Sequence, residues 1–119
     1  PFMIVIIITF AIAAAIGLTM ILKVFQNKKP LKAVAISHGM FAATSLVLLV
    51  LESIKNQDMS VISLIFFLVA ASAGFFMFYK DFFEKNRELV ASAVPKPVAF
   101  IHASSAIVGF ILLVVVYLL

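Results

Sequence analysis

Four long stretches of the chain contain no charged residue, and they decide what kind of fold it can adopt. They cover residues 2–22, 33–51, 59–79 and 97–119 and are 21, 19, 21 and 23 residues long. An α-helix needs about 20 residues to cross the ~30 Å hydrocarbon core of a bilayer. In lipid the backbone must satisfy its own hydrogen bonds, which runs of this length do as helices. We therefore predict an all-α protein with four transmembrane helices, over about residues 2–25, 32–52, 58–80 and 96–119.

The composition supports a membrane protein with a single domain, residues 1–119. Of the 119 residues, 66% are hydrophobic and 12% are charged, which excludes a soluble core. The net charge of +4 does not indicate nucleic acid, because the lysines cluster at the ends of the apolar stretches. The chain has no cysteine, which excludes disulfides, thiolate metal sites and a covalently attached c-type haem.

The links between the predicted helices are short, which makes consecutive helices antiparallel neighbours. We therefore expect an up-down-up-down four-helix bundle. The longest link, residues 81–95, carries Phe82, Phe83, Leu89 and Val90 among charged residues, which indicates a short helix at the membrane interface. Pro95 and Pro97 suit the first turn of the last helix, where no backbone donor is lost.

The basic residues are distributed unevenly over the links. Eight of the nine lie in or beside the first and third links, and the second link carries only Lys55. The positive-inside rule then places the two lysine-rich links in the cytoplasm and both termini outside. An inner or plasma membrane, such as that of a bacterium, is the expected location, with the lipid bilayer as the first partner.

The chain repeats itself. Residues 32–39 share Lys, Val, Ala and His with residues 96–103, at an offset of 64. Residues 13–23 share Ala, Ala, Gly, Met and Lys with residues 70–80, at an offset of 57. The second helix thus matches the fourth and the first matches the third, which indicates a duplicated helical hairpin.

Two histidines and two glycines fall at one depth in the predicted bundle. His38 and His102 each follow a lysine by six residues, and Gly17 and Gly74 each precede one by six. At ~1.5 Å rise per residue, all four lie ~9 Å inside the lysine-rich interface. The second and fourth helices are diagonal in such a bundle, so the histidines can face each other. Glycine on the other two helices would leave space for a flat macrocycle.

This layer has the residue types that bind haem. Neutral imidazole is a strong axial ligand for haem iron, and iron with two of them is suited to electron transfer, because no position stays open. Ala42 and Ala106 each follow a histidine by four residues, so they lie on the same helix face as that histidine. The other ring nitrogen needs an acceptor, for which backbone carbonyls one turn back and the Ser105 hydroxyl are both candidates. The predicted metal ligands are His38 and His102, and the predicted cofactor-binding residues are His38, His102, Gly17, Gly74, Ala42 and Ala106. The propionates would lie near Lys28, Lys29, Lys32 and Lys96.

In this layer the chain resembles the membrane b-type cytochromes, in which histidines of the second and fourth helices hold haem and glycines of the first and third make space. The resemblance implies a non-covalent haem b and electron transfer with other redox subunits or a quinone, within a respiratory or other redox complex. Those families commonly hold a second haem on a histidine pair about fourteen residues further along. Here those positions are Glu52 and Val116, so we expect one haem.

Other functions have less support in the sequence. A cofactor-free structural or assembly subunit, packed through its histidines, is the main alternative, and a small transporter is a third. Two histidines alone make a poor zinc site, because zinc takes four ligands. Hydrolysis would need a carboxylate to orient the base. An electron-transfer subunit is therefore expected rather than a stand-alone enzyme.

Overall fold

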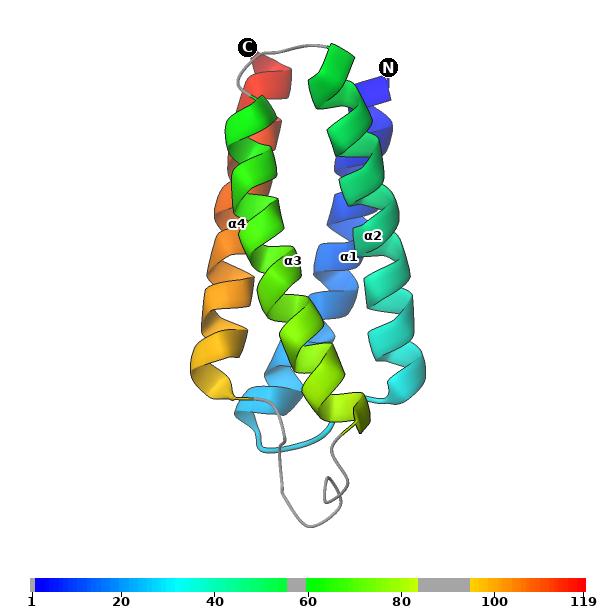
Figure 1. Ribbon diagram of the computed structural model, residues 1–119, viewed down its shortest axis with the longest axis vertical. Coiled ribbons are helices and arrows are strands. Elements are labelled where there is room, and N and C mark those ends of the chain that lie inside the picture. The colour runs from blue at the N-terminus through cyan, green and yellow to red at the C-terminus, as the bar shows by residue number, and fades with distance from the viewer. Residues whose placement is uncertain (1, 56–59, 84–94) are drawn as a thin grey trace.

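The computed structural model describes residues 2–55, 60–83 and 95–119, and within them the chain forms α-helices and no strand. The helices are α1 (Phe2–Phe25), α2 (Lys32–Lys55), α3 (Ser60–Phe83) and α4 (Lys96–Leu118), shown in Figure 1. All four are long and apolar enough to cross a membrane. The predictions of an all-α fold and of four helices able to cross a membrane are confirmed.

Two helices extend further than their predicted ends at residues 52 and 80. α2 runs to Lys55 and α3 runs to Phe83. The segment 81–83 therefore belongs to α3 and not to a separate interfacial helix, and residues 84–94 of that predicted helix lie outside the described residues. An uncharged stretch measures only the apolar length of a helix. The backbone hydrogen bonds continue past it, because charged side chains are compatible with a helix at the headgroup level.

The ends of two helices follow from local chemistry. After α1, the Lys28 amide donates to the Lys23 carbonyl at 2.8 Å and the Asn27 amide donates to the Val24 carbonyl at 3.1 Å. Asn27 has a φ of 58°, the left-handed conformation that closes a helix in this pattern and that asparagine tolerates. At the start of α4, Pro95 is the N-cap. Pro97 lies in the first turn, where the missing donor costs nothing.

Each helix packs against two others. α1 contacts α2 and α4, and α3 also contacts α2 and α4, with the closest packing within the pairs α1–α2 and α3–α4. Thus α2 and α4 lie on one diagonal of the bundle, and α1 and α3 on the other. Figure 1 shows both ends of the chain at one end of the bundle and the α1–α2 connection at the opposite end.

The half of the bundle near the chain termini contains an apolar core. This terminal core consists of Ile6, Phe10, Leu49, Phe67 and Leu113, all buried. The rings of Phe10 and Phe67 stack across the bundle with centroids 4.0 Å apart and planes 5° from parallel. The repeat offsets of 57 and 64 relate Phe10 to Phe67 and Leu49 to Leu113. The terminal core is therefore built from matching positions of the two halves.

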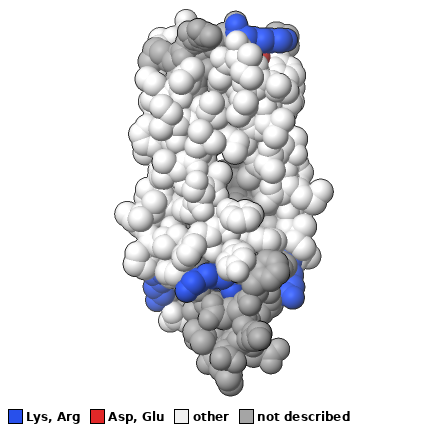
Figure 2. Space-filling view, viewed as in Figure 1, with Lys and Arg blue, Asp and Glu red and all other residues white. Residues whose placement is uncertain are grey.

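Basic side chains gather at the end of the bundle opposite the chain termini. Figure 2 shows basic side chains near the end that carries the α1–α2 connection and others at the opposite end, with a wide uncharged belt between the two groups. A belt of this kind fits the hydrocarbon layer of a bilayer.

Candidate functional site

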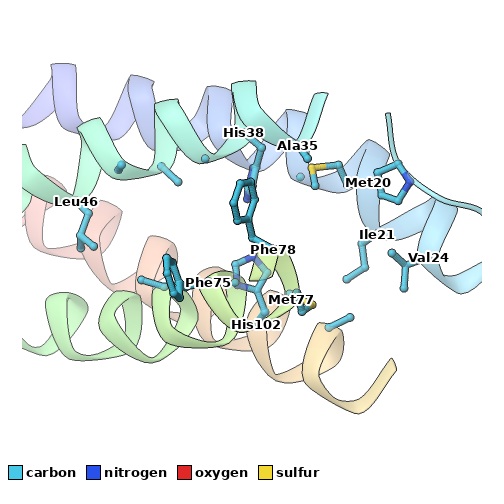
Figure 3. A pocket seen from close by; sticks show the side chains of 18 residues that line it. Met20, Ile21, Val24, Ala35, His38, Leu46, Phe75, Met77, Phe78 and His102 are labelled. Carbon is cyan, nitrogen blue, oxygen red and sulfur yellow. The ribbon is translucent and has the colours of Figure 1, made fainter. Parts of the chain in front are cut away.

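His38 of α2 and His102 of α4 point toward each other across the bundle (Figure 3). Their ring centroids are 6.0 Å apart and their planes make an angle of 80°. Both side chains are half-buried. The structure thus brings together the two histidines that the sequence places at one depth.

Each imidazole is fixed by a backbone carbonyl of the adjacent helix. Nδ1 of His38 donates to the Ala13 carbonyl of α1 at 2.8 Å, and Nδ1 of His102 donates to the Ala70 carbonyl of α3 at 2.6 Å. A carbonyl oxygen can only accept, so both Nδ1 atoms carry the hydrogen. In the neutral ring Nε2 then keeps its lone pair free for a metal.

These acceptors differ from both sequence candidates, the carbonyls one turn back on the same helix and Ser105. Each carbonyl belongs to the neighbouring helix and lies four residues before the glycine of that helix. A signal for them was present in the repeat, because Ala13 and Ala70 are 57 residues apart and each precedes its glycine by four.

Gly17 and Gly74 make space for the imidazole rings. A Cβ atom at Gly17 would lie 2.8 Å from Cε1 of His38, and one at Gly74 would lie 3.0 Å from Cε1 of His102. Contacts this short do not occur between unstrained atoms. The glycines therefore let each ring edge approach the neighbouring helix closely enough to reach its carbonyl. From the sequence we expected the two glycines to leave space for a macrocycle. Residue spacing does not give the direction in which the imidazoles point, so the approach of each ring to the neighbouring backbone was not predicted.

A cavity of about 430 Å³ adjoins both histidines, a volume in the range of small-molecule and cofactor sites. Five of the six predicted cofactor-binding residues line it: Gly17, His38, Ala42, Gly74 and His102. Ala106 is half-buried and is not part of the lining. Sequence reasoning missed much of the apolar wall, which includes Ile21, Leu46, Phe75 and Phe78. Met20 and Met77 also line it.

The donor set and its spacing fit a haem. A metal–imidazole bond is about 2 Å long, and a ring centre lies roughly 1 Å behind its nitrogen, so two imidazoles on one iron have centres roughly 6 Å apart. The observed 6.0 Å agrees with this spacing. An apolar wall suits a porphyrin, and a neutral imidazole nitrogen is a ligand type that haem iron accepts. Among the described residues no three His, Cys, Asp or Glu side chains come together.

The lysines nearest in sequence lie toward the charged end. Lys32 and Lys96 are the first residues of α2 and α4, six residues before the histidines. At ~1.5 Å per residue, their backbones lie ~9 Å along the bundle from the imidazole layer.

No protein-family model, curated protein or solved structure matches this chain.

Proposed function

We propose that this protein is a membrane b-type cytochrome that holds one non-covalent haem between His38 and His102. The observation that supports this most strongly is the pair of opposed imidazoles, 6.0 Å apart and each held by a carbonyl through Nδ1. In that arrangement both Nε2 atoms keep a lone pair available to bind one iron. The adjoining apolar cavity supplies volume for a porphyrin.

A bound haem supplies one-electron chemistry, cycling between Fe(III) and Fe(II). The protein's own residues set the conditions for it. The Ala13 and Ala70 carbonyls accept from Nδ1, which fixes the ring orientation and raises the basicity of Nε2. The surrounding alanine, methionine and phenylalanine side chains exclude water. Electrons would be exchanged with other redox subunits or with a quinone, within a respiratory or other redox complex.

One haem per chain is proposed because the other half of the bundle is filled. The stacked Phe10 and Phe67 rings and the buried Leu49 and Leu113 occupy its centre. Glu52 and Val116 stand where a second histidine pair would be needed.

We also propose an up-down-up-down topology that arose by duplication of a helical hairpin. The support is that functionally matched contacts recur at the repeat offsets. His38 with Ala13 corresponds to His102 with Ala70, and Gly17 corresponds to Gly74. Side chains that merely filled a core would not require the same carbonyl acceptor twice.

The proposed orientation places the lysine-rich links in the cytoplasm and both termini outside, in an inner or plasma membrane of bacterial type. The support is the concentration of lysine at one end of the bundle (Figure 2) together with the positive-inside rule.

The alternative function is a cofactor-free structural or assembly subunit. The specific observation in its favour is that each histidine already links two helices through its Nδ1 bond. Such interhelical bonds contribute about 1 kcal/mol or less in membranes.

An absorbance spectrum of the detergent-purified protein, expressed with haem available, tests the proposal. Reduction with dithionite should sharpen a b-type α band. His38→Ala and His102→Ala should each abolish it, because either change removes one axial ligand. Phe100→Ala is the control, since Phe100 is 66% exposed and does not line the cavity, and it should keep the band. A colourless parent protein would favour the structural subunit.

A further inference from the structure

The cavity beside the histidines opens to the outer surface of the bundle between α2 and α3. Its lining on α2 includes Gly39 and Ala43, and its lining on α3 includes Ala71 and Phe75. All four are exposed, Phe75 to 71%. These residues lie within the apolar length of their helices, so the opening faces the hydrocarbon layer rather than water.

The side between α4 and α1, which the repeat relates to the side between α2 and α3, carries larger side chains. The repeat offset of 64 places Ala103, Ile107 and Phe110 of α4 where α2 has Gly39, Ala43 and Leu46. Each α4 residue is the larger of its pair. From α4, which the structure describes throughout, only Ala99 and His102 line the cavity. The two halves therefore diverge where side-chain size decides whether the cavity reaches the surface.

The path to the cavity from the end with the chain termini is filled. Toward the chain termini the Phe10–Phe67 stack and the rest of the terminal core occupy the bundle centre. Toward the charged end, Val24 and Pro30 border the cavity. A planar apolar molecule dissolved in the bilayer can therefore approach the cavity between α2 and α3, where the lining residues are exposed.

We propose that haem reaches the two histidines sideways from the bilayer, through this opening between α2 and α3. The inference rests on the proposed haem function and adds the route to it. Gly39 and Ala43 keep the route open, because they project little side chain into it. The α1–α4 side, which carries Ala103 and Ile107 at the matching positions, is not a route.

The test compares haem loading in variants that block one side or the other. Gly39→Leu places a side chain in the opening, and a Cβ at this position has no neighbour within 4 Å. Ala103→Leu is the matched control at the pseudo-symmetric position. A second pair is Ala43→Phe with Ile107→Phe. Haem-free protein in lipid nanodiscs is mixed with haemin, and the growth of the Soret band gives the loading rate. Transfer of bound haem to excess apomyoglobin gives the release rate.

Blocking a route slows loading and release by the same factor and leaves affinity unchanged, whereas damage to the site changes affinity. We expect Gly39→Leu and Ala43→Phe to slow both loading and release by about tenfold. Slower release distinguishes a blocked route from a weakened site, because a weakened site releases haem faster. Ala103→Leu and Ile107→Phe should stay within about twofold of the parent. If Gly39→Leu takes up no haem, the Ala43 pair gives the comparison.

Equal rates in all four variants, or slowing on the α4 side instead, would overturn the proposed route while leaving the haem function intact. A parent protein that gives no Soret band at all would overturn both. These two failures are therefore distinguishable in one experiment.

Discussion

At the scale of residues, the site is a matched set of three groups in each half of the chain: a histidine, a glycine that admits its ring, and the carbonyl one turn before that glycine. The histidines and glycines could be predicted, because their spacing from lysine repeats. The carbonyl acceptors could not be assigned, because every residue carries a carbonyl and only the direction of the imidazole selects one. The role of the glycines depends on that same direction.

Alanine at either glycine should weaken haem binding. A Cβ at Gly17 or Gly74 would lie 2.8 or 3.0 Å from an imidazole carbon, so the ring must move and its Nδ1 bond to the carbonyl lengthens. Overpacking of this kind costs about 1–3 kcal/mol, which corresponds to roughly fivefold to 150-fold weaker haem affinity. Haem titration of the purified variants measures this.

The control for that experiment is Gly109→Ala, which adds a Cβ 3.2 Å from Phe66 at a position that does not line the cavity. Parent-like affinity in Gly17→Ala and Gly74→Ala would show that the close approach of ring and backbone is dispensable.

At the scale of elements, the number of helices follows directly from the number of uncharged stretches, whereas their ends do not. α3 continues to Phe83 although the uncharged stretch stops at Tyr79, because charge limits burial in lipid and not helix formation. The stacking of Phe10 on Phe67 could also not be predicted from the sequence. The chain has 13 phenylalanines, and neither composition nor spacing separates the buried pair from those that face lipid.

Phe67→Ala should destabilise the bundle without removing haem. Lipid is as apolar as the core, so the loss comes from the void that remains and not from transfer out of water. The void should cost on the order of 2 kcal/mol. Unfolding in a titration with sodium dodecyl sulfate, followed by circular dichroism, measures the change.

Phe100→Ala is the matched change on the lipid-facing surface, since Phe100 is 66% exposed. It should leave unfolding nearly unchanged. Equal destabilisation by both variants would contradict the role assigned to the stack.

At the scale of the whole molecule, composition and the uncharged stretches lead to a membrane-spanning all-α protein, and the structure agrees. The placement of α2 and α4 on one diagonal brings the two histidines together. The lateral opening between α2 and α3 was not predictable, because it depends on small size differences between repeats that only packing reveals.

The proposed orientation predicts which residues are accessible from each side of the membrane. The chain has no cysteine, so Leu119→Cys and Gln26→Cys each introduce a single reactive thiol. In intact cells, a membrane-impermeant maleimide should label Leu119→Cys and leave Gln26→Cys unlabelled. Inverted vesicles should give the reverse pattern, and labelling of Gln26→Cys from outside would contradict the orientation.

The central claim is that one haem binds between one pair of histidines within each chain. Titration of haem-free protein with haemin, followed at the Soret band, tests it most directly. We expect a single break at one haem per chain, and no such break in His38→Ala or His102→Ala. A break at two haems per chain, or an undiminished response in either histidine variant, would contradict the claim.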